Sequence, residues 1–325
     1  MAADKPFDLK MFDVRAFGTK GDGQALDTAS IQKAIDACQA GGGGMVYFPT
    51  GTYRAGTLKL KSNMRLHLAA GARLLGSRDL GDYVTRPKGE FCHGTGSAWV
   101  LLHGVGVQNV TLEGEGTIDG AKAGHVDPVT GRWQRGPLGI LFERSTNISL
   151  LDLTVTQIPG WAVTFFDCEH VDIHRLRVRD VMADGINPVC CRHVLYDSVT
   201  IDGTGDDPIT IKNEGPVTGL PLTSDIVISN CVVRNTTHPG FKIGTGTSGV
   251  FRNILVRDCV FDIAGSAFCI QLMRPTHDPE RAIDNLRIAN VTVQRARQLF
   301  DITTMGVERP VIRNLSFSDI TYRSA

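Results

Sequence analysis

Three copies of one pattern point to the fold of this chain: Asn147-Ile148-Ser149-Leu150, His170-Val171-Asp172-Ile173 and His193-Val194-Leu195-Tyr196. In each copy a polar residue precedes alternating apolar residues, and the first aliphatic residue of one copy lies 23 residues after that of the last. The pattern returns at longer intervals in five further segments: Asn109-Val110-Thr111-Leu112, Asp225-Ile226-Val227-Ile228, Asn253-Ile254-Leu255-Val256, Asn285-Leu286-Arg287-Ile288 and Asn314-Leu315-Ser316-Phe317. The period of two is typical of β-strands, and helical periodicity is nearly absent after residue 60.

Repeats of 20 to 30 residues that consist of short strands predict a solenoid whose turns stack as parallel strands. The predicted fold class is therefore all-β, a parallel β-helix. Leucine-rich repeats have a similar period, but their Leu-x-x-Leu-x-Leu ladder is missing from this sequence. A propeller would need longer units built from antiparallel hairpins.

The first sixty residues differ from the rest and predict a cover for the open end of the solenoid. Asp27-Thr28 can cap a helix that ends at the run Gly41 to Gly44, and the strand Met45 to Phe48 follows it. The apolar residues at helical spacing are Ile31, Ala34, Ile35 and Cys38. We expect one domain, residues 1–325, in which residues 12–60 form an N-terminal capping helix and the first coil.

Composition excludes several classes of protein. The chain has 325 residues, is 42% hydrophobic, and balances 34 basic against 34 acidic residues, so its overall charge indicates no nucleic-acid partner. No apolar run reaches the length of a membrane span, and eight cysteines in so long a chain do not make a disulfide scaffold. We expect most of them to be buried thiols, with Cys231 and Cys259 stacked in the interior.

The N-terminus, Met-Ala-Ala-Asp-Lys-Pro, has no apolar segment typical of a signal peptide. This fits a cytoplasmic protein, or a secreted or periplasmic protein whose export signal has been removed. We expect a monomer with no membrane partner.

Four chemically active residues fall at nearly one place in successive repeats. Asp184 lies 13 residues after Val171, Asp206 and Asp207 lie 12 and 13 after Val194, and His238 lies 12 after Ile226. If each repeat is one coil, these side chains stack about 4.8 Å apart and form a patch on one side of the solenoid.

Crowding of like charges in such a patch should raise at least one carboxyl pKa, so that the group can hold a proton for general acid catalysis. Neighbours in a regular strand point to opposite faces, but Gly205 and Pro208 predict a bend that lets both Asp206 and Asp207 face outward. The alternative is structural: polar ladders at solenoid turns bond exposed backbone, and His238 could be such a capping residue.

Three segments together resemble the ordered signature of glycoside hydrolase family 28, the polygalacturonases and their relatives. They are Asp184-Gly185-Ile186-Asn187-Pro188, Gly205-Asp206-Asp207 and His238-Pro239-Gly240-Phe241-Lys242-Ile243-Gly244, and the segment Phe12 to Gly18 extends the resemblance to the N-terminal region. The resemblance implies a right-handed parallel β-helix that hydrolyses a glycosidic bond with inversion and without metal or organic cofactor.

The resemblance also implies roles for the four residues. Asp206 would protonate the leaving oxygen, Asp184 and Asp207 would position and deprotonate the attacking water, and His238 would support the protonation of the acid. One point stands against inversion: carboxylates on adjacent coils lie near the ~5 Å spacing of retaining enzymes, whereas inverting enzymes show ~6.5–9.5 Å. We give the family resemblance more weight than this distance and expect inversion.

The sequence departs from the family pattern in three places. The family's Asn-Thr-Asp reads Met182-Ala183-Asp184, Pro239 separates His238 from its glycine, and the Arg-Ile-Lys element reads Cys269-Ile270-Gln271. An uncharged pair cannot make the charge-assisted contact that a galacturonate carboxylate would use. We therefore expect a hydrolase of a pectic or related acidic glycan that is not a standard polygalacturonase.

The residues predicted to bind the oligo- or polysaccharide substrate are Lys212, Lys242, Arg274 and Gln271. Trp161 and Trp133 could stack on a sugar, although a core tryptophan is the default. The glycine-rich interval of residues 113–140, with His125, Asp127 and Arg135, is a candidate wall of the cleft.

Two other classes use the same solenoid. A polysaccharide lyase would need a basic residue to remove the C5 proton of a uronate, usually beside calcium, and the acid stack has no arginine-rich counterpart at the same phase. A non-catalytic glycan-binding protein would need no acid pair. We place the lyase second and the binding protein third.

Overall fold

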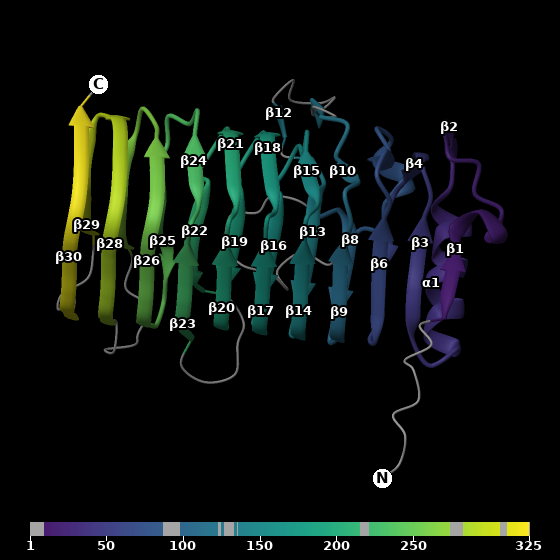
Figure 1. The fold of residues 1–325 in the computed structure, drawn as a ribbon, viewed down its shortest axis with the longest axis horizontal. Coiled ribbons are helices and arrows are strands. Elements are labelled where there is room, and N and C mark those ends of the chain that lie inside the picture. Colours follow the sequence, from purple (N-terminus) through teal and green to yellow (C-terminus); the bar gives the residue numbers. More distant parts are fainter. Residues whose placement is uncertain are drawn as a thin grey trace, which may run out of the picture.

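The chain folds as a right-handed parallel β-helix, seen here in a computed structural model. The structure describes residues 10–86, 98–122, 125–126, 133–134, 136–214, 221–273, 282–305 and 311–324. Figure 1 shows the coils stacked in sequence order from the purple N-terminal end to the yellow C-terminal end. The predicted fold class is confirmed.

Each regular coil contributes one strand to each of three faces, and every strand pairs in parallel with its counterpart on the next coil. The first face contains β1 (Met11–Asp13), β3 (Gly44–Phe48), β6 (Met64–Leu68), β9 (Gln108–Glu113), β14 (Thr146–Leu151), β17 (Glu169–His174), β20 (Arg192–Asp197) and β23 (Leu222–Ser229). The second face contains β2 (Asp22–Leu26), β4 (Gly51–Ala55), β7 (Ala72–Gly76), β10 (Thr117–Asp119), β15 (Thr154–Thr156), β18 (Arg177–Val181), β21 (Thr200–Thr204) and β24 (Val232–Arg234).

In the last coils these two faces run together in three long strands: β26 (Val250–Asp262), β28 (Ala282–Ala296) and β30 (Val311–Ser324). The third face is a nine-stranded sheet of β5 (Leu58–Lys59), β8 (Val100–Val105), β13 (Leu138–Glu143), β16 (Val163–Phe166), β19 (Ile186–Val189), β22 (Ile209–Asn213), β25 (Phe241–Thr247), β27 (Ser266–Met273) and β29 (Gln298–Met305). A short antiparallel hairpin, β11 (His125–Val126) with β12 (Trp133–Gln134), stands apart from these sheets.

The aliphatic residues that define the repeat stack directly on one another. Val171 pairs with Ile148 on one side and with Val194 on the other, and the same column continues through Ile226 and Ile254. These side chains are buried in one continuous hydrophobic core. Cys231 and Cys259 are also buried there, as predicted, and all seven cysteines among the described residues are buried and free.

The polar residue before each aliphatic residue has a structural role in the turn. These residues adopt the left-handed backbone conformation, with φ between 55° and 62°: Asn63, Asn109, Asn147, His170, His193, Asp225, Asn253, Asn285 and Asn314. Asparagine and aspartate tolerate this conformation better than most residues. Their side chains also bond along the stack, so the polar ladder considered as the structural alternative exists at this turn.

The predicted helix is α1 (Thr28–Ala40), and its buried residues are the four that the spacing indicated. The cap differs from expectation: the Asp27 carboxylate accepts hydrogen bonds from the backbone of Lys20 and Gly21 and makes none to the helix. Figure 1 shows α1 at the N-terminal end beside β1 and β3. That it covers the end of the stack stays a prediction, as does the single domain of residues 1–325.

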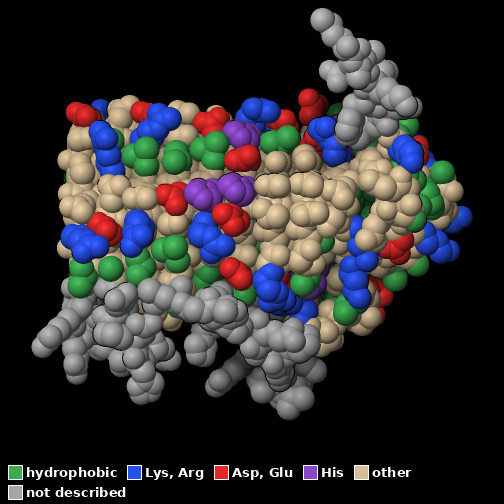
Figure 2. Space-filling model, turned by 90° about the horizontal axis from the view of Figure 1, so that it is seen from below, with side chains coloured by type: hydrophobic (Ala, Val, Ile, Leu, Met, Phe, Trp, Pro, Cys, Tyr) green, Lys and Arg blue, Asp and Glu red, His purple; other side chains and the backbone are tan. Residues whose placement is uncertain are grey.

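Among the described residues, the remaining helical segments are two short 3-10 turns, η1 (Val14–Phe17) and η2 (Leu80–Asp82). None of the helices in the described part of the chain combines the length and the apolar character that crossing a bilayer requires. Figure 2 shows acidic and basic side chains interspersed in rows on the face it presents, in agreement with the balanced charge.

The left-handed turn can be tested at Asn253, which is exposed. Asn253→Ala should be less stable than Asn253→Gly by about 1 kcal/mol, because alanine resists a positive φ and glycine does not. Both variants lose the ladder amide, so the difference between their urea unfolding free energies isolates the backbone contribution. Equal stability, or a more stable alanine variant, would show that the backbone conformation is not the constraint.

Candidate active site

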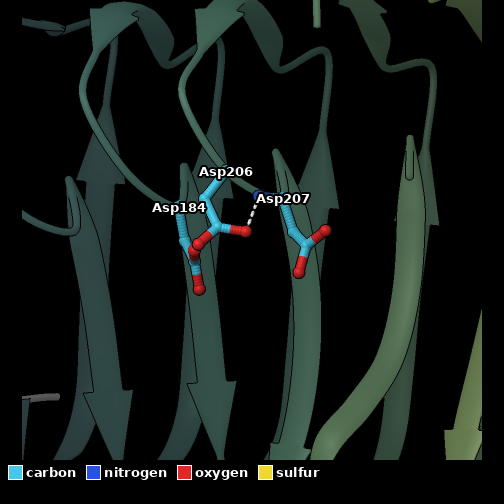
Figure 3. A group of neighbouring side chains, drawn as sticks. All are labelled: Asp184, Asp206 and Asp207. Carbon is cyan, nitrogen blue, oxygen red and sulfur yellow. Dashed lines mark hydrogen bonds between the residues drawn. The ribbon is translucent and has the colours of Figure 1, made fainter. Parts of the chain in front are cut away.

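Three aspartates converge where the second face turns into the third. Asp184 lies between β18 and β19, and Asp206 and Asp207 lie between β21 and β22. One carboxylate oxygen from each lies within 4.8 Å of the others. Figure 3 shows the carboxyl groups of Asp184 and Asp206 directed toward one another with that of Asp207 beside them. The spacing in the sequence therefore placed these three residues correctly.

The register of the strands explains this convergence. Ile186 pairs with Ile209, so Asp184 and Asp207, each two residues earlier, occupy the same position on neighbouring coils. Asp206 adds a second carboxylate because the chain bends there, and its Oδ1 accepts a hydrogen bond of 3.0 Å from the backbone N–H of Asp207. The bend predicted from Gly205 and Pro208 is present.

Two glycines let the coils approach at this point. A Cβ on Gly205 would lie 2.4 Å from the carbonyl oxygen of Met182, and one on Gly185 would lie 2.4 Å from that of Pro208. Any larger residue would push the backbones apart. The glycines thus hold the turns that carry the carboxylates at their close spacing.

Two lysines neutralise part of this charge. Lys212 Nζ lies 2.8 Å from Asp184 Oδ2, and Lys242 Nζ lies 2.8 Å from Asp207 Oδ2. Lys212 also lies 3.8 Å from the ring centroid of Trp161, which is only 2% exposed. Trp161 is therefore a buried partner of Lys212 in this structure rather than an open surface for a sugar.

The carboxyl group of Asp207 has a strongly raised pKa. Burial raises its pKa to about 6, with the nearby Asp184 charge adding to the rise and Lys242 opposing it. Burial would lower the pKa of Lys242, but its pairing with Asp207 outweighs burial and raises the pKa. Lys242 holds Oδ2 of Asp207, while the buried Oδ1 receives no hydrogen bond from the protein. The expected rise in a carboxyl pKa is confirmed, with burial as its first cause.

His238 lies on the next coil, at the position that corresponds to Asp206. It is half-buried three residues before Phe241, which pairs with Ile209, and it lies outside the group of carboxylates that share the 4.8 Å limit. Its Nδ1 is 3.4 Å from the hydroxyl of Thr237. Its role stays a prediction.

Sequence reasoning missed two threonines that join the turns. Thr204 Oγ1 donates to the carbonyl oxygen of Asp206 at 2.6 Å and lies 3.1 Å from Thr236 Oγ1, which accepts from the backbone N–H of His238. Thr204 lies five residues before Ile209, and Thr236 lies five residues before Phe241, which pairs with Ile209. This equal offset was the signal in the sequence that the two threonines are neighbours. They tie the turn of Asp206 to that of His238.

The segment that replaces the basic element of the family lies on β27. Cys269 pairs with Lys242 on β25, and burial raises the pKa of its thiol to about 11, so this position is uncharged. Gln271 pairs with Thr303. Lys242 therefore lies one coil away from position 269, where the family resemblance predicts an arginine. Only the strand register shows this relation.

Several predicted residues lie outside the described part of the chain. These residues are Arg274, Asp127 and Arg135. Of His125 and Trp133 only the backbone is described. The predictions that Arg274 binds substrate and that residues 113–140 form a wall of the cleft stay open.

The three aspartates also form the one group among the described residues whose ligand atoms are close enough to share a cation. The ammonium groups of Lys212 and Lys242 already contact two of the carboxylates. A metal ion would have to displace or repel these charges. That the site works without metal stays a prediction.

Comparisons with known proteins bear on the family and the fold of the chain. The family described as "Glycosyl hydrolases family 28" matches residues 49–294, and the one described as "Rhamnogalacturonase A/epimerase, pectate lyase-like" matches residues 11–69. A probable polygalacturonase of Vitis vinifera is 28% identical over 270 residues, which cover 75% of this chain and 53% of the relative. The chain thus spans about half the length of that relative.

Two further comparisons bear on fold and chemistry. The solved exopolygalacturonase of Thermotoga maritima covers 95% of this chain and 81% of its own, with a TM-score of 0.74 at 21% identity, which shows a shared fold. Mannuronan C5-epimerase AlgE1 of Azotobacter vinelandii is 24% identical over 80% of this chain and 16% of the relative.

The control of Asp207 by Lys242 can be measured directly. Lys242→Met should move the pKa of Asp207 above about 6, because the variant removes the ammonium that opposes burial. NMR titration of ¹³C-labelled aspartate carboxyl groups, assigned with Asp207→Asn, gives the shift. Lys212→Met is the matched control and should move Asp207 less, since its ammonium bonds Asp184. A pKa unchanged or lowered in Lys242→Met would contradict the proposed control.

Proposed function

The chain belongs to glycoside hydrolase family 28, and on this premise we propose that it hydrolyses a glycosidic bond in a pectic or related acidic glycan by an inverting acid–base mechanism. The observation that carries the proposal is the trio of carboxylates within 4.8 Å, two of them bonded to lysines. Glycoside hydrolysis needs one group to protonate the leaving oxygen and another to activate water.

We assign protonation of the leaving oxygen to Asp206. It is the least buried of the three aspartates, so its carboxyl group is the one best placed to meet a bound substrate. His238, tied to the same turn through Thr204 and Thr236, supports this group.

Asp184 and Asp207 are then left to hold and deprotonate the attacking water. A lysine fixes one oxygen of each carboxylate, and Oδ1 of Asp207 is free of protein donors and can accept a proton. A base of pKa about 6 is well matched to neutral conditions, because it is ionised and still basic enough to take a proton.

The stereochemical outcome rests on this division of roles. The close spacing of the carboxylates by itself favours retention. A retaining enzyme needs one nucleophile beside its acid, whereas two lysine-bonded carboxylates beside Asp206 suit the positioning of a water molecule. Proton NMR of the first product anomer tests this choice, and a product with the starting configuration would refute inversion.

The substrate class follows from the cations near the site. Lys242 is next to the position where the family carries an arginine, and one of its three N–H donors is used by Asp207. The others can meet a substrate carboxylate, so Lys242, together with Lys212, Gln271 and Arg274, stays our predicted binding set. A single lysine cannot reproduce a bidentate arginine contact, which is why we expect a preference different from that of a standard polygalacturonase.

The second candidate is chemistry at C5 of a uronate. It is favoured by the similarity to the relative named mannuronan C5-epimerase, and a lyase would begin with the same proton abstraction. A hydrolase releases reducing ends without ultraviolet absorbance, a lyase forms absorbing unsaturated ends, and an epimerase changes the sugar without cleaving the chain. Screening pectic and alginate polymers with all three readouts separates these activities.

Asp206→Asn should lower turnover by about 10²–10⁴-fold, because the amide cannot donate a proton to the leaving oxygen. The melting temperature should change little, since the Asn side chain can still accept the bond from the N–H of Asp207. Asp202→Asn is the matched control on the same coil, where the carboxylate pairs with Arg234. Normal turnover by Asp206→Asn on a verified substrate would remove its assigned role.

The pH dependence should report the ionisation of Asp207. Because its folded-state pKa is raised to about 6, the carboxyl is protonated below that pH and cannot act as a base. We expect the acid limb of the kcat/KM profile to rise with pH through about 6, and Lys242→Met should move this limb to higher pH. A fall in kcat/KM as pH increases through 6 would instead make Asp207 the proton donor.

A further inference from the structure

A groove lined by arginines lies on the outside of the second face, and none of the three aspartates is part of its lining. It has a volume of about 870 Å³ and extends over the coils from β2 to β18. Arg54, Arg73, Arg78 and Arg179 line it. This size falls within the range of known ligand sites.

The acids in the groove are already paired, which leaves a surplus of positive charge. Asp119 bonds Arg73 at 2.6 Å, and Asp180 bonds Lys122 at 2.7 Å. The ion pairs among the described residues include none with Arg54, Arg78 or Arg179. Three guanidinium groups therefore line the groove without an ion pair to any acid among the described residues.

Arg54 adds an independent sign that an acceptor belongs here. Its Nε is buried and has no hydrogen-bond partner in the protein. Buried N–H groups are almost always paired, and those of a charged guanidinium most of all. A carboxylate that reaches this nitrogen would satisfy the donor.

The spread of the cations indicates an extended ligand. Arg54 is on β4 and Arg179 is on β18, four strand steps apart through β7, β10 and β15. At about 4.8 Å a step the two arginines lie roughly 19 Å from each other along the solenoid. A small anion could reach only one end, whereas a linear chain with a carboxylate on each sugar could meet both.

We propose that this groove is an accessory, non-catalytic site for a carboxylate-bearing oligosaccharide. Only the choice of uronate as the anion rests on the proposed function. The groove ends at Arg179 and Asp180, on the coil of Asp184, so a polymer held there stays close to the active site. Such tethering raises the local concentration of the substrate for the catalytic carboxylates.

The test uses the full chain carrying Asp206→Asn, so that no probe is cleaved, and measures binding of oligogalacturonate by calorimetry. Adding Arg54→Gln and Arg179→Gln should weaken binding in the groove at least about tenfold, and binding should weaken as salt is raised. Arg234→Gln is the matched control, because Arg234 stands in the same outward column beyond the groove and pairs with Asp202. It should leave binding unchanged.

Two further probes separate the possible causes. Fully methyl-esterified oligogalacturonate has the same backbone without charge and should not bind the groove, and inorganic sulfate should bind weakly at most. Unchanged oligogalacturonate binding in the double arginine variant, or equal binding of the neutral probe, would overturn the proposal. Sulfate bound as tightly as the oligosaccharide would also overturn it, since that would show a site for small anions.

An activity readout distinguishes this proposal from the proposed function. In the otherwise unaltered enzyme, the double arginine variant should raise KM for the polymer and leave kcat/KM for a disaccharide unchanged. An inactive parent protein that still loses oligogalacturonate binding in the double variant would refute the hydrolase and retain the groove. If the protein is active and the two substitutions change neither its KM for the polymer nor its binding of oligogalacturonate, the groove proposal alone is refuted.

Discussion

The stacking of one buried aliphatic side chain on the next sets the register on which the rest of this structure depends. In a strand, a slip of one residue would turn the interior side chains outward and bring polar ones into the core, so the hydrophobic effect holds each coil at a single offset from its neighbour. The column through Ile148, Val171, Val194 and Ile226 is the visible result. Left-handed residues before each of these aliphatics let the chain turn into the next strand without disturbing that offset.

The same register produces the candidate active site, at some cost in stability. It brings three carboxylates within 4.8 Å of each other at a partly buried turn, an arrangement that repulsion and desolvation oppose. Lys212 and Lys242 offset part of that cost, and the raised pKa of Asp207 shows that part of it remains. Strain of this kind is expected where a protein does chemistry, because a fully relaxed carboxylate is a poor base near neutral pH.

The prediction from sequence was most accurate where one rule applied throughout. Equal offsets from the aliphatic residues correctly grouped Asp184, Asp206 and Asp207, and the buried stack of Cys231 with Cys259 followed from the same counting. It was least informative for long, flexible side chains. Lys212 and Lys242 were predicted as cations close to the acids, but the spacing did not indicate that each reaches an aspartate on the neighbouring coil. It also did not indicate that the hydroxyls of Thr204 and Thr236 join the turns of Asp206 and His238.

The amino-acid sequence by itself determined the class of fold, the order of the coils and the identity of the acids at the site, because periodic burial leaves a periodic trace along the chain. The tertiary structure alone decided which cation meets which carboxylate, which oxygen of Asp207 stays free, and which arginines share a groove. The reason is physical, because the backbone register depends on the spacing of apolar residues along the chain, and the repeat shows that spacing directly. The pairing and acidity of side chains depend on three-dimensional distance and on exclusion of water, which the repeat does not record.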